Sequence, residues 1–81
     1  MEIITIHIFS PDKRKISYRI DIDNIFEVVF QHYCEKQLVS CQQMKLIYND
    51  KEINIYNTAR ELNMKNGCKI YSKLKSREEM I

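Results

Sequence analysis

The stretch FEVVFQHYCEKQ, residues 26–37, decides whether this chain holds a catalytic helix or a purely structural one. Its large apolar residues recur at i, i+3, i+4 and i+7, the spacing of one helical stripe: Phe26, Val29, Phe30 and Tyr33. Asn24 and Glu27 have the spacing of a capping box, so we expect the helix to begin at Asn24. His32 and Cys34 lie two positions apart and point in different directions on a helix, so they cannot form a nucleophile and base pair. The stretch therefore predicts a structural helix.

The length and charge of the chain limit what it can do. Its 81 residues suffice for one domain that buries about 60% of its unfolded surface, which leaves little room for an enclosed active site. Lysines and arginines number 13 against 11 aspartates and glutamates, and this small excess does not predict nucleic-acid binding. No leader and no long apolar run are found, so we expect no membrane association. We expect a monomeric domain at residues 1–75 and a loose tail at 76–81.

The three cysteines fit neither a disulfide scaffold nor a zinc site. Cys34, Cys41 and Cys68 cannot all pair within one chain, no CxxC spacing is present, and no metal-ligand pattern links them to His7 or His32. We therefore expect no metal and no cofactor, and a reducing compartment such as the nucleus or the cytoplasm. The sequence also lacks a glycine-rich phosphate loop and a paired-carboxylate site, so we expect no enzymatic activity.

Two stretches before the helix alternate with the period of a β-strand. EIITIHIF at residues 2–9 places three isoleucines on one face, namely Ile4, Ile6 and Ile8. KISYRIDI at residues 15–22 places four apolar residues on one face, namely Ile16, Tyr18, Ile20 and Ile22. Pro11 and Asp12 supply a turn between them. The two stretches predict a first hairpin.

The part of the chain after the helix predicts a second hairpin, a short helical turn and a last strand. MKLIY at 44–48 and KEI at 51–53 flank an Asn-Asp pair that tolerates a tight turn. Thr58 and Glu61 have capping-box spacing and predict one helical turn. CKIYSKLK at 68–75 alternates again as a strand. The order of elements predicts an α+β domain in which one helix packs across a mixed sheet.

The end of the helix and the segments after it resemble the SUMO family of ubiquitin-like proteins. The family carries Y-C-x-R-Q at the helix end, and YCEKQ supplies the same residues at Tyr33, Cys34 and Gln37. Its T-x-x-E-L-x-M motif before the last strand is matched by TARELNM at Thr58, Glu61, Leu62 and Met64. Its F-L-F-[ED]-G-Q-R-I hairpin is matched in kind by Ile47 and Ile53. The resemblance runs from about residue 16 to 70 and implies the β-grasp fold, with the helix across the sheet.

Three departures from the family pattern bear on function. SUMO is conjugated through a C-terminal Gly-Gly, whereas this sequence contains one glycine, Gly67, so we expect it not to be conjugated as it stands. The acidic run that helps to dock the SUMO E2 enzyme is replaced by Lys65, Asn66, Gly67 and Cys68, which argues against E2 docking in the usual pose. The glycine that ends the family helix is Leu38 here, so either Leu38 is left-handed at about 1–2 kcal/mol or the helix exits differently.

The resemblance implies a peptide-binding groove between the second strand and the helix. In SUMO-like domains this groove takes short apolar peptides with acidic flanks, which pair with the strand edge. The residues at matching positions are Ile16, Ser17, Tyr18, Arg19, Ile20, Val29, His32 and Lys36. Asp21 and Val28 replace family lysines, which predicts low affinity or altered specificity for acidic peptides. Alternation alone is equally typical of a strand whose apolar residues are only core.

A second candidate surface lies on the predicted sheet. Ile47 occupies the place of the central isoleucine of ubiquitin's binding face, and Tyr71 is expected nearby with a basic rim that includes Lys45, Lys69 and Lys73. An apolar centre with a basic rim is typical of an interaction surface, although two exposed apolar residues on a small sheet are also ordinary.

The leading hypothesis is a non-catalytic SUMO-like domain that recognises proteins noncovalently through the groove. The expected partners are peptides with a SUMO-interacting motif or enzymes of the SUMO pathway. One alternative is a general ubiquitin-like adaptor domain that uses the Ile47 and Tyr71 face. Another is a SUMO modifier whose Gly-Gly end is absent from this sequence.

Overall fold

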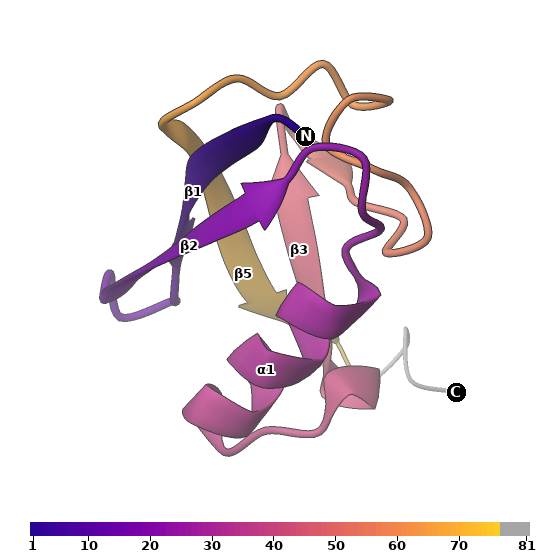
Figure 1. Ribbon diagram of the computed structural model, residues 1–81. Coiled ribbons are helices and arrows are strands. Elements are labelled where there is room, and N and C mark those ends of the chain that lie inside the picture. Colours follow the sequence, from indigo (N-terminus) through magenta and orange to yellow (C-terminus); the bar gives the residue numbers. More distant parts are fainter. Residues whose placement is uncertain (77–81) are drawn as a thin grey trace.

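The computed structural model describes residues 1–76, which form a five-stranded mixed sheet and one main helix (Figure 1). The elements in chain order are β1 (Ile3–Phe9), β2 (Lys15–Asp21), α1 (Glu27–Gln37), the 3-10 helix η1 (Cys41–Gln43), β3 (Met44–Tyr48), β4 (Lys51–Glu52) and β5 (Cys68–Leu74). The strands lie in the order β2-β1-β5-β3-β4, with β1 and β5 parallel and the other neighbours antiparallel. This arrangement confirms the predicted β-grasp fold. Of the predicted tail, residues 77–81 lie outside the described part of the chain.

The core lies between the sheet and α1. The three isoleucines predicted on one face of β1 are all buried, and Phe26, Phe30 and Tyr33 of the helical stretch are buried with them. Val29, the fourth residue of the apolar stripe, is half-buried and packs against the same cluster. The period-2 and period-3.6 patterns in the sequence therefore identified the buried faces of the first strand and of the helix.

The N-cap of the helix lies two residues later than the sequence predicts, at Phe26 rather than at Asn24. The first helical residue is Glu27, and no side chain caps this end. The N–H of Asn24 instead donates to the carbonyl of Asp21 in a turn, at 3.0 Å. Ile25 forms a β-bridge with Thr58, and the Phe26 N–H donates to the carbonyl of Asn57. A local turn thus satisfies the Asn24 amide, and pairing with a distant loop holds residues 25 and 26 outside the helix.

The helix ends at Leu38 in the left-handed conformation, which was one of the two predicted alternatives. Leu38 has φ 57° and ψ 38°, and its N–H donates to the carbonyls of Cys34 and Glu35. The next amide, of Val39, also donates to the Cys34 carbonyl at 3.1 Å. Leu38 is 93% exposed, so its side chain gains little from packing in this position.

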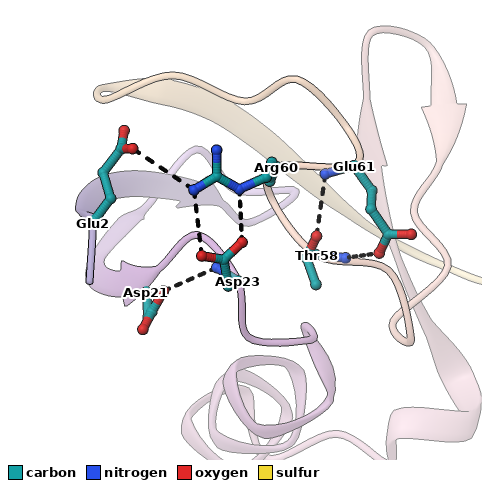
Figure 2. Close-up of polar contacts among 6 residues, drawn as sticks. All are labelled: Glu2, Asp21, Asp23, Thr58, Arg60 and Glu61. Atoms are coloured by element: carbon teal, nitrogen blue, oxygen red, sulfur yellow. Dashed lines mark hydrogen bonds and ion pairs between the residues drawn. The ribbon is translucent and has the colours of Figure 1, made fainter.

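The predicted turns after the helix are confirmed. Asn49 and Asp50 both have positive φ and join β3 to β4. In the segment before β5, the Thr58 N–H donates to Glu61 Oε1 and the Glu61 N–H donates to Thr58 Oγ1, which are the two bonds of a capping box (Figure 2). Gly67 has φ 86°, and its N–H donates to the Thr5 carbonyl at 2.6 Å as the chain enters β5.

A relay of two hydroxyls fastens α1 to the middle of the sheet. Tyr33 is fully buried, and its hydroxyl lies 2.8 Å from Ser72 Oγ. Ser72 Oγ donates in turn to the Phe9 carbonyl at 3.0 Å. Because a carbonyl can only accept and serine has one hydroxyl proton, the proton between the two side chains comes from Tyr33. The relay joins α1 to β5 and β1.

The direction of the relay predicts that substitutions of Tyr33 and of Ser72 lower the free energy of unfolding by different amounts. Tyr33→Phe removes one donor and should lower the free energy of unfolding by about 1 kcal/mol. Ser72→Ala should cost more, about 1–3 kcal/mol, because it leaves the buried Tyr33 hydroxyl without its acceptor. Urea unfolding of both variants and of the double variant measures this. The double variant should lose less free energy of unfolding than the two single variants lose in sum. Equal losses for the two single variants would contradict the assigned direction.

The left-handed helix end predicts a stabilising substitution. Leu38→Gly should raise the free energy of unfolding by about 1 kcal/mol, because glycine adopts positive φ without the penalty that a Cβ brings. Leu38→Ala is the matched control, since it removes the side chain but keeps the Cβ. Urea unfolding should show a gain for the glycine variant only, and an equal gain for alanine would mean that the exposed side chain, not the backbone, is responsible.

Candidate functional site

β2 is an edge strand. Within residues 1–76, no other strand pairs with the side of β2 that faces away from β1. It pairs with β1 alone among the described strands and stands at one end of the strand order. Every residue of β2 has a partner on β1, from Lys15 opposite Phe9 to Asp21 opposite Ile3. An edge of this kind presents backbone donors and acceptors to which another strand can pair.

The predicted groove residues separate into buried, half-buried and exposed positions. On β2, Ile20 is buried, Ile16 and Tyr18 are half-buried against the core, and Ser17 and Arg19 are exposed. On α1, Val29 is half-buried, and the two polar positions are exposed, His32 and Lys36. The half-buried residues thus belong in part to the core and in part to the surface beside the strand.

Tyr18 and His32 are brought into direct contact between β2 and α1. The Tyr18 hydroxyl lies 2.9 Å from His32 Nδ1, and the two rings meet edge to face with centroids 5.5 Å apart. Burial raises the pKa of Tyr18, so its hydroxyl keeps its proton and donates when Nδ1 carries none. The contact therefore spans the space between β2 and α1 that the predicted groove would occupy. Sequence reasoning placed both residues in the groove but did not foresee the bond between them.

Charged side chains stand along the strand and on the helix. Lys15 and Arg19 of β2 and Lys36 in the last turn of α1 are exposed, as expected for residues that attract acidic groups. Asp21 is half-buried and accepts a hydrogen bond from the Asp23 N–H at 2.9 Å. Val28, the other residue that replaces a family lysine, is 72% exposed on α1.

The second candidate surface lies on the sheet face turned away from the core. Cross-strand partners form one row over all five strands, in the order Lys15, Phe9, Tyr71, Ile47 and Glu52. Tyr71 is 50% exposed and stacks on Phe9, with ring centroids 5.5 Å apart and planes 25° apart. Lys69 lies opposite His7, and Lys45 lies opposite Lys73. The four residues predicted for this face thus share it.

Sequence reasoning missed the contribution of β1 and its turn to this face. A shallow hollow of about 630 Å³ lies beside Tyr71, and its wall includes Phe9, Pro11 and Lys13. A second hollow of about 560 Å³ lies on the other side of Tyr71, toward the β3–β4 turn. Alternation with the buried Ile8 places Phe9 on the outer face, but only the strand order shows that it lies beside Tyr71.

The three cysteines are free thiols. Cys34 is buried, and this burial, together with a hydrogen bond to Cys41, raises the pKa of its thiol to about 12. A thiol that stays protonated at neutral pH is a poor nucleophile. Among residues 1–76, no three His, Cys, Asp or Glu side chains gather where they could hold a metal ion. In the same range, no helix has the length and apolar character needed to cross a membrane.

Arg60 ties the loop before β5 to the end of β2 (Figure 2). Its Nε lies 2.7 Å from Asp23 Oδ1 and its Nη2 lies 3.3 Å from Oδ2, so the contact is bidentate. The same Nη2 lies 3.9 Å from Glu2 Oε1. The backbone supports this clamp, because the Arg60 N–H donates to the Ile22 carbonyl at 3.0 Å. The hydrogen bond from Arg60 holds the pKa of Asp23 below its ordinary value.

Comparison with known protein families identifies the domain. Residues 4–70 match the family described as Ubiquitin-2 like Rad60 SUMO-like, abbreviated Rad60-SLD. The chain belongs to this family. The matched range begins in β1 and ends within β5, and the SUMO resemblance read from the sequence is confirmed. A comparison with curated proteins found no match. SUMO-like domains generally bind other proteins, and ubiquitin-like domains are typically not enzymes.

The contact between Arg60 and Asp23 in this Rad60-SLD domain predicts how the Asp23 carboxyl titrates. Because the folded-state pKa of Asp23 is lowered, its contribution to stability is present above the ordinary pKa of 3.8 and is lost as the pH falls through the folded value. Arg60→Gln should therefore move the Asp23 midpoint upward, toward 3.8, in a carboxyl ¹³C NMR titration. Asp12 is the control, because its pKa is lowered mainly by Ser10, and its midpoint should not move. An unchanged Asp23 midpoint would contradict the role of Arg60.

Proposed function

We propose that this domain recognises other proteins noncovalently by pairing a short peptide strand with the outer edge of β2, beside α1. The observation that carries the proposal is that β2 is an edge strand, paired on one side only within residues 1–76, and that half-buried apolar residues accompany it. Backbone hydrogen bonds from such an edge supply affinity for almost any extended peptide, and side-chain pockets select among them.

The side chains along the edge favour a peptide with a β-branched apolar centre. Ile16 and Tyr18 on β2 and Val29 on α1 are half-buried, so each has apolar surface left for a ligand. Narrow, branched side chains such as valine and isoleucine pack well against a pleated surface. An arriving peptide would cover these residues and gain the burial that the domain itself leaves incomplete.

The charges around the edge favour acidic residues at the ends of the peptide. Lys15, Arg19 and Lys36 are exposed and attract carboxylates during encounter. Asp21 opposes this attraction at one end of β2, and Val28 adds no charge on the helix. We therefore propose a preference for peptides whose acidic residues lie toward the Lys15 end of the strand, with modest affinity.

The proposed role is recognition without covalent chemistry. The raised pKa of Cys34 supports it, because the buried thiol is unsuited to nucleophilic attack. The residues given hold one glycine, Gly67, which occupies a turn before β5 and belongs to no Gly-Gly pair. The proposed partners are proteins of the nucleus or cytoplasm that carry such acidic, apolar segments, including enzymes of the SUMO pathway.

Titration with a synthetic acidic peptide rich in valine and isoleucine tests the proposal. Amide shifts in an ¹⁵N-labelled domain should concentrate at residues 15–21 and 28–36. Arg19→Glu should weaken binding about tenfold, because it reverses a charge beside the peptide. Lys51→Glu is the matched control, since Lys51 is exposed on β4 at the opposite edge of the sheet, and it should change binding little.

The Tyr18 to His32 contact provides a second readout. Tyr18→Phe removes the hydrogen bond between β2 and α1 but keeps the ring, so it should leave binding equal or stronger if the peptide displaces that bond. Peptide shifts that avoid both β2 and α1, or Arg19→Glu binding as well as the unchanged domain, would refute the groove.

A further inference from the structure

We infer that His32 makes peptide binding in the groove between β2 and α1 depend on pH, a role that rests on the function proposed above for this groove. Its ligand is an acidic extended peptide, which binds more tightly as the pH falls from about 8 to about 5.5 because His32 takes up a proton over this range. The charge on His32 and the presence of the groove can be tested separately.

His32 lies in the middle of an exposed stripe on α1. Val28, His32 and Lys36 follow one another at four-residue spacing, so they lie along the same face of the helix. All three are exposed, and the contact with Tyr18 shows that this face is turned toward β2. Val28 carries no charge, so Lys36 is the one fixed cation among the three. When His32 takes up a proton, the positive charge of the stripe doubles.

The contact with Tyr18 determines which ring nitrogen of His32 is available to a ligand. The Tyr18 hydroxyl lies 2.9 Å from Nδ1, and the two rings meet edge to face with centroids 5.5 Å apart. In a neutral imidazole one nitrogen carries the proton and the other accepts, so a hydroxyl that donates to Nδ1 leaves the proton on Nε2. Within residues 1–76, no hydrogen bond or ion pair engages Nε2. Its N–H is therefore available to a ligand.

Protonation of His32 changes the charge of the ring without breaking this contact. A phenol oxygen accepts as well as donates, so the Nδ1–H of an imidazolium can donate to the Tyr18 oxygen in place of the reverse bond. Burial raises the pKa of Tyr18, so its hydroxyl stays neutral and does not offset the new charge. The groove therefore gains one positive charge at a fixed position.

The groups around His32 leave this charge available to a ligand. On α1, Lys36 lies four residues later and opposes protonation, while Glu35 lies three residues later and favours it. Both are exposed, so solvent and salt screen their effects. On β2, the face turned toward the helix carries Tyr18 and two isoleucines, which do not titrate. Within residues 1–76, no ion pair joins His32 to an acid, so a carboxylate on a peptide can supply that partner.

An acidic peptide and a proton on His32 should bind cooperatively. A carboxylate beside the imidazolium favours the charged ring, so the midpoint of the His32 titration is higher in the complex than in the free domain. The added affinity is present in full below the free midpoint and is lost as the pH rises through the bound midpoint. One ion pair at an exposed site changes affinity by up to about fivefold. Linkage then requires the midpoint to rise by about 0.7 pH unit.

An N-acetylated peptide with a valine and isoleucine centre and flanking aspartates is the probe. The acetyl group removes the α-amino group, which would otherwise titrate at about pH 8. The affinity of the labelled full chain for this peptide should rise about fivefold from about pH 8 to about pH 5.5. A peptide with asparagines in place of the aspartates should show no rise, because it carries no carboxylate beside the ring.

NMR titration of the two histidine rings locates the proton. The aspartate peptide should raise the His32 midpoint by about 0.7 pH unit. His7 is the internal control, because it alternates with the buried Ile6 and Ile8 and so lies on the other face of the sheet, with Nδ1 at 2.7 Å from Ser17 Oγ. Its midpoint should not move. In the free domain at about pH 8, long-range ¹H–¹⁵N correlations should show the proton of His32 on Nε2.

Variants of the two histidines complete the test. His32→Asn removes the titration and keeps a side-chain acceptor near Tyr18, so its affinity for the aspartate peptide should no longer rise as the pH falls. His32→Lys fixes the charge and should also remove the rise. His7→Asn is the matched control and should keep the rise of the unchanged domain. A thermal unfolding curve at both pH values checks that each variant is folded.

The possible failures are distinguishable. Peptide shifts at residues 15–21 and 28–36 with equal affinity at both pH values would overturn the role of His32 and leave the groove standing. A neutral His32 ring protonated on Nδ1 would contradict the assigned bond from Tyr18. A rise in affinity that His32→Asn keeps and His7→Asn loses would assign the effect to the other face of the sheet. Absence of the groove shifts at both pH values would overturn the groove, and the role of His32 with it.

Discussion

The Tyr33 hydroxyl donates to Ser72, and Ser72 donates to the Phe9 carbonyl, so one buried relay sets the position of α1 against β5 and β1. Ser72 can take part only if it points toward the helix, and side chains alternate along a strand. Tyr71 and Lys73, its neighbours, must therefore face away from the core. Slipping β5 by one residue would bury a lysine and expose Ile70, so the register is strongly determined. The orientation of Ser72 that holds the helix therefore also determines which residues of β5 lie on the outer face.

The sequence predicts the fold well because the fold depends on local patterns. Alternating isoleucines identify β1, and the YCEKQ and TARELNM segments identify the helix end and the turn before β5. The helix start was wrong because its determinant is not local. Ile25 pairs with Thr58, more than thirty residues away, and this pairing keeps residues 24–26 out of the helix. A capping signal of about 1 kcal/mol cannot decide a boundary against several tertiary hydrogen bonds.

The sequence could predict which residues lie on each candidate surface, but not which of them contact one another. Tyr18 and His32 were both assigned to the groove, yet their bond depends on how far α1 lies from β2. Phe9 could be assigned to the outer face by alternation, yet its place beside Tyr71 depends on the parallel pairing of β1 and β5. Parallel partners are distant in the sequence, and no pattern in either strand records which residues face each other. Strand order and register are therefore what the structure adds.

The two surfaces use different parts of the sheet and so respond differently to sequence change. The proposed recognition at the β2 edge relies on backbone groups, which persist whatever side chains β2 carries, so Asp21 and Val28 would alter its strength rather than its mode. Side chains of the outer face can change without loss of the core because they point away from it. The hollow beside Tyr71 shows this freedom, since three of its lysines lie one position from a buried or turn residue whose role is structural. The sheet thus separates the residues that hold the core from the residues that are free to vary on its outer face.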